Sequence, residues 1–177
     1  MDERQTKVLT RLQAQCVRRE YCVSDIAAKA VKALDGDREA AQPVVDALVA
    51  DRFVDNLRYA SAFAREKAAL SGWGPVKIRF ALSAKGIDRE TIAAALEEID
   101  GTSAERKMET VLRTKYRTLA EDPQCRLKLL KFGLGRGYEY EEIRQLVDRI
   151  IRERDGADEA SIEPDHPQRS AGQIQSG

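Results

Sequence analysis

The stretch that decides the fold runs from residue 48 to residue 99 and reads LVADRFVDNLRYASAFAREKAALSGWGPVKIRFALSAKGIDRETIAAALEEI. Its apolar residues recur at spacings of three and four, which is the period of an amphipathic helix. Gly72, Pro75 and Gly86 interrupt this pattern, and such residues favour helix ends and first helical turns. The stretch therefore predicts three short helices, the last of which begins after Asp88 as its N-cap.

The segments on either side of this stretch show the same pattern. Residues 85–87 (KGI) are matched by residues 136–138 (RGY), and the apolar positions of 92–99 recur in 143–150. An offset of about fifty residues is typical of repeat proteins. The sequence therefore predicts an all-α protein, an elongated array of three tandem three-helix repeats with about nine helices. The repeats are expected at residues 3–53, 54–101 and 102–154.

Polar and small residues predict where individual helices begin and end. In the second repeat, Asp55 or Asn56 is expected to cap the first helix. The expected signals elsewhere are Ser24 or Asp25 as a cap, Pro43 in a first turn, Gly101 as a stop, Thr102 with Glu105 as a capping box, and Asp122 with Pro123 as a start. The inward stripe of the helix after Pro123 is expected to contain Leu127, Leu130 and Leu134.

The helical period ends near residue 155. From there to residue 177 the chain is rich in Asp, Glu, Gly, Pro and Ser, which do not support a packed element. We expect residues 155–177 to form a disordered acidic tail.

The charge balance limits the classes of partner. The chain has 30 basic and 30 acidic residues and a formal net charge of zero, so a nucleic-acid role would need a local basic patch. Cys16, Cys22 and Cys125 are odd in number and lack paired spacing, which predicts reduced thiols without a disulfide or a zinc site. With no signal peptide and no long apolar run, we expect a cytoplasmic protein with no membrane contact.

No constellation of residues predicts catalysis. The only histidine, His166, lies in the expected tail, so acid/base chemistry or metal ligation by histidine has no scaffold. Gly133, Gly135 and Gly137 alternate, but no strand precedes them and the lysine of a phosphate-binding loop is missing. The expectation is a protein that is not an enzyme, without catalytic, cofactor-binding or metal-binding residues.

Basic residues form stripes along several expected helices. Arg58 and Arg65 are seven residues apart and are expected on an outward polar face of one helix. The candidate partner-binding residues are Arg58, Arg65, Lys77, Arg79, Lys85, Arg106, Arg113, Arg117, Lys128 and Lys131. The alternative is that these charges are simply solvated. Trp73 is expected to pack between helices rather than to anchor an interface.

The order and spacing of one set of residues resembles the RecX family, bacterial regulators of the RecA recombinase. The resemblance covers roughly residues 8–151. It rests on Asp51, Arg52, Phe53, Tyr59, Ala60, Phe63, Arg65, Trp73, Gly74, Pro75, Lys77, Ile78, Leu82, Lys85, Gly86 and Ile87. These residues are helix-packing signals, and none is a chemical reagent.

The resemblance implies a binding protein whose partner is RecA polymerised on single-stranded DNA. An elongated monomer in the groove of that filament would inhibit ATP turnover and strand exchange in DNA repair and recombination, and ATP would belong to the partner. Two alternatives remain at this point: a helix-turn-helix-like protein that binds nucleic acid directly, and a generic helical scaffold. A steeply salt-dependent affinity for naked DNA would favour the first of them.

Overall fold

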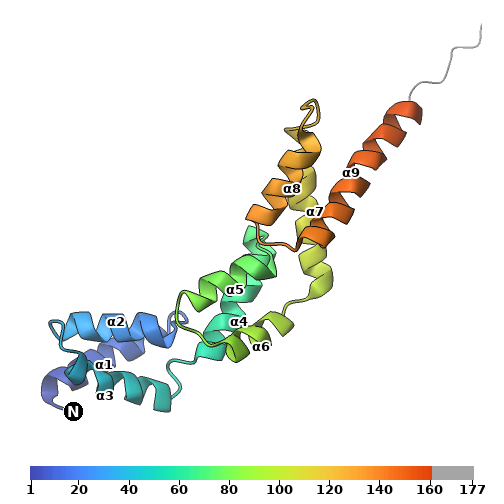
Figure 1. Cartoon of the computed structure of the whole chain (residues 1–177). Coiled ribbons are helices and arrows are strands. Elements are labelled where there is room, and N and C mark those ends of the chain that lie inside the picture. The colour runs from blue at the N-terminus through green and yellow to red at the C-terminus, as the bar shows by residue number, and fades with distance from the viewer. Residues whose placement is uncertain (161–177) are drawn as a thin grey trace, which may run out of the picture.

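The protein is an elongated, all-helical array (Figure 1). The computed structural model describes the backbone of residues 1–160 and the side chains of residues 1–154. Within residues 1–160 there is no β-strand, and the elements are α1 (Glu3–Cys16), α2 (Val23–Ala33), α3 (Arg38–Ala50), α4 (Asn56–Glu66), the π-helical turn η1 (Lys67–Ser71), α5 (Pro75–Ser83), α6 (Arg89–Glu97), α7 (Gly101–Arg117), α8 (Cys125–Gly135) and α9 (Tyr140–Ala160). The predicted all-α fold of three tandem three-helix repeats is confirmed.

Each group of three helices buries its own hydrophobic core. The first repeat (α1–α3) is centred on Ile26 and Leu48, and the second (α4–α6, with η1) on Ile78 and Ile92. The third repeat (α7–α9) is centred on a cluster that includes Ile143. Full burial of one such side chain stabilises the fold by about 1.5–3 kcal/mol, so each small core depends on a few residues.

Several predicted helix ends in the second repeat are confirmed. The Asp55 and Asp88 side chains cap α4 and α6, accepting hydrogen bonds from the amides of the third residue along at 2.9 and 2.8 Å. Pro75 occupies the first turn of α5. Gly72 and Gly86 have φ values of +61° and +72°, a left-handed conformation that glycine adopts without strain.

Other expected helix ends are wrong, and at α3 and α7 the reason is a nearby aspartate that caps the helix. Pro43 lies inside α3, since the Asp37 side chain accepts from the Ala40 amide at 2.9 Å and starts the helix earlier. Gly101 is not a stop, because Asp100 caps α7 and makes Gly101 its first residue, which also rules out the Thr102 capping box. Helix α2 begins at Val23, before Ser24 and Asp25, and α8 begins at Cys125, after Asp122 and Pro123.

The orientation of α8 also differs from the expected one. Leu127 and Leu134 are 49% and 46% exposed, whereas Leu129 is fully buried. The sequence CRLKLLKFGLG has apolar residues on every side of the helix, so its periodicity does not select a face. Leu130 is buried as expected.

The helix at the C-terminal end is longer than the sequence indicates. Helix α9 continues to Ala160, so the first residues of the expected tail are helical. The remainder of that prediction, residues 161–177, lies outside the described residues.

The two joints between repeats bring corresponding segments together. At the joint between the second and third repeats, the Gly74 amide donates to the Arg136 carbonyl at 2.7 Å, and the Val76 amide donates to the Gly137 carbonyl at 3.0 Å. At the joint between the first and second repeats, the hydroxyl of Ser24 near the start of α2 donates to the carbonyl of Lys85, just after α5, at 2.6 Å. The C-terminal end of α8 therefore meets the start of α5, and the C-terminal end of α5 meets the start of α2 (Figure 1).

The joint between the second and third repeats is built on close backbone contact. A Cβ atom on Gly74 would lie 2.3 Å from the Gly137 carbonyl oxygen, and one on Gly137 would lie 2.3 Å from the Cβ of Lys77. The hydroxyl of Tyr138 donates to the Gly72 carbonyl at 2.9 Å, and burial raises the pKa of this phenol. Side chains larger than glycine do not fit at either position without a backbone shift.

The joint between the first and second repeats depends more on charge. The Nζ atom of Lys85 lies 2.8 Å from a carboxylate oxygen of Asp25, and the Val23 amide donates to the Asn56 side chain at 2.9 Å. Burial by itself would raise the pKa of Asp25, but hydrogen bonds from Lys85 and Cys22, with the charge of Lys85, hold this pKa below its usual value. The ionised form of Asp25 is therefore favoured by the folded joint.

This pair predicts a pH dependence of stability. A carboxyl group whose pKa is lower in the folded state stabilises that state fully above its unfolded pKa of about 3.9, and the contribution is lost as the pH falls through the folded pKa. We expect Asp25→Asn to be less stable than the wild type toward urea at pH 7, and the difference to shrink below about pH 4. A difference that stays constant from pH 7 to pH 3 would contradict the assignment.

Candidate interaction surfaces

Half of the predicted partner-binding residues are engaged within the chain. Their side-chain partners are Glu20 for Arg58, Glu98 for Arg65, Asp25 for Lys85, Glu109 and Glu153 for Arg113, and Asp122 for Lys128. Arg58 and Arg65 are both exposed, as expected for an outward polar face, but each forms an ion pair that ties α4 to another segment. Sequence periodicity placed both residues on the outer side of α4 but gave no information about which carboxylates would reach them.

Arg58 holds the joint between the first two repeats. Its Nε lies 2.7 Å from Glu20, and its Nη2 donates to the carbonyls of Arg52 and Phe53 at 3.1 and 3.3 Å. The second carboxylate oxygen of Glu20 is buried without a hydrogen-bond partner in the described part of the chain, so this carboxylate depends on Arg58. The role of Arg58 that the structure supports is therefore structural.

We expect Arg58→Glu to lower the Tm by roughly 3–6 °C, the range for a loss of about 1–2 kcal/mol in a chain of this size. The substitution removes three interactions and places two carboxylates side by side. Arg79→Glu is the matched control, since Arg79 is exposed and forms no ion pair within the described residues. Equal Tm values for the two variants in a thermal unfolding experiment would contradict this role.

Four of the predicted cations have no ion-pair partner among the described residues. They are Arg79 on α5, Arg106 and Arg117 on α7, and Lys131 on α8, and all four are exposed. Lys77 differs from them, because its Nζ lies 4.5 Å from the centroid of the Trp73 ring and 3.4 Å from the Gly135 carbonyl. The predicted set therefore divides into ion-paired residues, Lys77 beside an aromatic ring, and exposed residues without an ion pair in the described structure.

Trp73 packs as expected, between helices. Its ring lies edge-on to Phe63, with centroids 6.2 Å apart and an interplanar angle of 73°, and it also has Lys67 at 5.5 Å. The indole is half-buried against the core of the second repeat and lines a cleft beside it.

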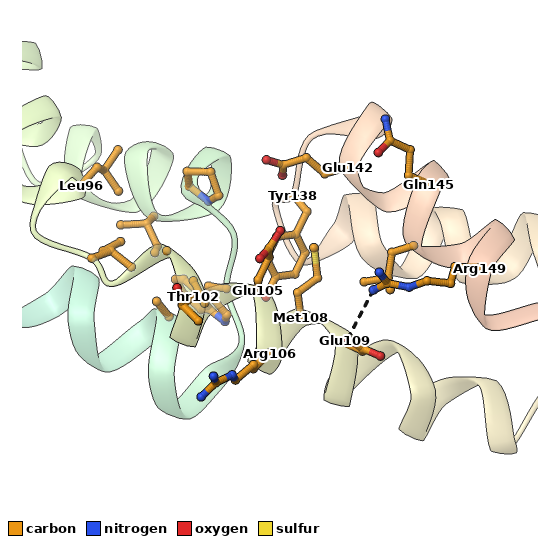
Figure 2. Close-up of a pocket in the computed structure, with 18 residues that line it drawn as sticks. Leu96, Thr102, Glu105, Arg106, Met108, Glu109, Tyr138, Glu142, Gln145 and Arg149 are labelled. Atoms are coloured by element: carbon orange, nitrogen blue, oxygen red, sulfur yellow. Dashed lines mark hydrogen bonds and ion pairs between the residues drawn. The ribbon is translucent and has the colours of Figure 1, made fainter. Parts of the chain in front are cut away.

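This cleft, of about 580 Å³, lies between the second and third repeats (Figure 2). Its apolar lining comes from α5, α6, α7, α9 and the segments beside them, with Ile78, Leu96, Ile99, Met108, Tyr138 and Leu146. Glu142 and Gln145 of α9 face Leu96 and Thr102 across the opening, and Arg149 pairs with Glu109 at 3.3 Å at one end. The cleft brings α9 against α5, α6 and α7, which precede it by more than twenty residues, and this is why the sequence did not predict it.

The cleft combines an apolar lining with charged residues at its edge. Among the residues that the structure describes, no group of three or more His, Cys, Asp or Glu side chains could hold a metal ion. Cys16, Cys22 and Cys125 are not paired with one another in the described structure. Within the described helices, none is both long and apolar enough to cross a membrane.

Comparison with known proteins gives a consistent result. The family model described as "RecX, second three-helix domain" matches residues 55–96, which correspond closely to α4–α6. Regulatory protein RecX of Xanthomonas axonopodis pv. citri (strain 306) is 34% identical over 128 residues, covering 72% of this chain and 78% of the relative. Regulatory protein RecX of Stenotrophomonas maltophilia (strain R551-3) is 32% identical over 129 residues, with 73% and 78% covered.

Two solved structures share the fold. A crystal structure of regulatory protein RecX superimposes with a TM-score of 0.72 at 22% identity, over 85% of this chain and 72% of that chain. RecX from Lactobacillus salivarius gives a TM-score of 0.71 at 20% identity, over 88% and 99%. With 34% identity to a regulatory protein RecX over 72% of this chain and a match to the second-domain model of the family, the chain belongs to the RecX family of regulatory proteins.

Proposed function

We propose that this protein regulates RecA by binding, as a monomer, to RecA filaments on single-stranded DNA, and that it inhibits their ATP hydrolysis and strand exchange. Membership of a family of regulatory proteins supports this proposal. The resemblance found in the sequence implies RecA as the partner. ATP is bound and hydrolysed by the partner, so this chain needs no cofactor of its own.

The observation that carries the proposal is the elongated array of three repeats (Figure 1). Each repeat has a separate core, and similar joints place the repeats one after another instead of folding them into a single globule. Extended arrays of this type present long surfaces to their partners. A long surface can contact more than one subunit of a filament, and the binding of adjacent subunits would restrain their movement during ATP turnover.

The test is a titration of the protein into RecA filaments assembled on single-stranded DNA, with ATP hydrolysis and co-sedimentation measured together. We expect the protein to pellet with the filaments and the rate of hydrolysis to fall as it is added. An unchanged rate together with no protein in the pellet would overturn the proposal.

Direct binding of nucleic acid is the second candidate function. It is favoured by the four cations of the predicted set that are exposed and lack ion-pair partners in the described part, which phosphate groups could neutralise. Binding to a single-stranded oligonucleotide without RecA, with an affinity that falls steeply with salt, would support this candidate. The zero net charge of the chain argues against it as the main function.

A further inference from the structure

The second helices of the three repeats form a row along one edge of the molecule (Figure 1). We propose that the exposed side of this row, formed by α2, α5 and α8, is the face that docks on the partner, and that it fits an acidic protein surface with apolar recesses. We call it the second-helix face. The inference rests on the proposed function and adds to it the location and chemistry of the contact.

The row is continuous because its helices meet end to end. The Gly74 and Val76 amides bond to carbonyls that follow α8, and the Ser24 hydroxyl bonds to the carbonyl of Lys85 that follows α5. The three helices contain 11, 9 and 11 residues. At 1.5 Å per residue the row is about 45 Å long, which is sufficient to contact more than one subunit of an assembly.

The charge of the row differs from that of the whole chain. Helices α2, α5 and α8 contain two, two and three lysines or arginines, and their only acidic residue, Asp25, is paired with Lys85. The chain as a whole has equal numbers of basic and acidic residues, so the rest of it carries an acidic excess. With seven basic residues and one acidic residue, the three helices together carry a net charge of +6, and the complementary partner surface is acidic.

Each helix of the row also offers one exposed cation that is free of ion pairs within the described residues. These are Lys32 on α2, Arg79 on α5 and Lys131 on α8. The remaining cations of α8 are paired, Arg126 with Asp148 at 2.8 Å and Lys128 with Asp122. Three unpaired charges spaced along a row are available to a partner without breaking contacts inside the chain.

Large apolar side chains lie among these cations. On α5, Val76 and Phe80 are one helical turn apart and are 41% and 76% exposed. On α8, Leu127 and Leu134 are two turns apart on the same side and are 49% and 46% exposed. Lys131 lies between these two leucines in sequence and on the same helical stripe.

The apolar residues favour a protein over a nucleic acid as the partner. Phosphate groups attract Arg79 and Lys131 but do not remove the side chains of Leu127 or Leu134 from water, whereas a protein surface can bury them. Phe80 could stack on a base, but it is the only aromatic residue on the exposed positions of the row in the described structure. An acidic protein surface with apolar recesses satisfies both kinds of side chain.

The test compares two triple variants of the full chain. The face variant combines Arg79→Glu, Phe80→Ser and Lys131→Glu. The control variant combines Arg38→Glu, Leu70→Ser and Arg89→Glu, which makes the same changes of charge and type at exposed positions of α3, η1 and α6. All six positions are exposed, so both variants should unfold within a few degrees of the wild type, which circular dichroism checks first.

Binding to RecA filaments is then measured by co-sedimentation, with the wild type as reference. We expect the face variant to bind at least tenfold more weakly and the control variant to bind within about twofold of the wild type. Phe80→Ser alone should weaken binding at high salt as well as at low salt, while the effect of Arg79→Glu should shrink as salt is added.

Three results would overturn the inference. The first is a wild type that binds filaments together with a face variant that binds equally well. The second is an equal loss in both triple variants. The third is a face variant that loses affinity for naked single-stranded oligonucleotide to the same extent as for filaments, which would assign the row to nucleic acid. If the wild type itself fails to bind filaments, the proposed function fails, and this outcome is distinct from the others.

Discussion

Ile92→Asp is expected to unfold the second repeat at room temperature or to leave it marginally stable. Ile92 is 1% exposed and lies in the core of that repeat with Ile78 and Leu82. The substitution loses the burial of a large aliphatic side chain and places a carboxylate among apolar atoms without a partner. The two effects together cost about 4 kcal/mol or more, which is a large part of the stability of a small domain.

Phe80→Asp is the matched control for this prediction. It introduces the same carboxylate into a neighbouring helix of the same repeat, but Phe80 is 76% exposed. Its Tm should remain within a few degrees of the wild type, while Ile92→Asp loses its cooperative transition by circular dichroism. Similar melting curves for the two variants would show that Ile92 is not in a tightly packed core. Because Phe80 also belongs to the second-helix face, the control should fold normally and still bind RecA filaments poorly.

Gly74→Ala is expected to open the joint between the second and third repeats. The added Cβ would lie 2.3 Å from the Gly137 carbonyl oxygen and 2.5 Å from the Tyr138 amide nitrogen, and both contacts are with backbone atoms that cannot rotate away. The φ of Gly74 is −82°, which alanine adopts freely, so the effect is purely steric. We expect a loss of about 2–3 kcal/mol.

The measurement combines thermal unfolding with amide hydrogen exchange. In the variant, the amides of Gly74 (now alanine) and Val76 should exchange faster, because they donate across the joint. Gly101→Ala is the control, since nothing lies within 4 Å of a Cβ at that position, which is the first residue of α7. Exchange at Val76 that is unchanged in Gly74→Ala would show that the joint tolerates a methyl group.

Most of the local structure of this protein could be predicted from its sequence. Apolar spacing identified the helices, and Asp88 was identified as a cap where it was the single candidate; of the two candidates Asp55 and Asn56, the structure uses Asp55. Where two residues could each start a helix, the prediction based on the weaker signal was wrong. Pro43 was expected at a helix start. The helix instead begins after Asp37, six residues before the proline, because the Asp37 carboxylate accepts a hydrogen bond from the Ala40 amide. A capping interaction is local and contributes about 1 kcal/mol, so the sequence identifies the cap only when no second candidate lies nearby.

The glycines of the second and third repeats show which features could be predicted from the sequence and which required the tertiary structure. The match of residues 85–87 with 136–138 was visible in the sequence, and Gly86 and Gly137 share a positive φ. The sequence did not show that these two loops contact the N-terminal ends of α2 and α5 and so form the joints. That role depends on contacts between residues about sixty positions apart, for which periodicity carries no signal.

The tertiary structure alone decided which charges are available. In the sequence, Arg58 and Arg79 are equivalent exposed arginines on helices, but the fold brings Glu20 to Arg58 and no carboxylate to Arg79 among the described residues. The cleft between α6, α7 and α9 and the end-to-end row of α2, α5 and α8 are likewise products of packing. The physical reason is range: helix periodicity and capping act within one or two turns, whereas ion pairs and docking faces are set by side chains that meet only after the repeats have stacked.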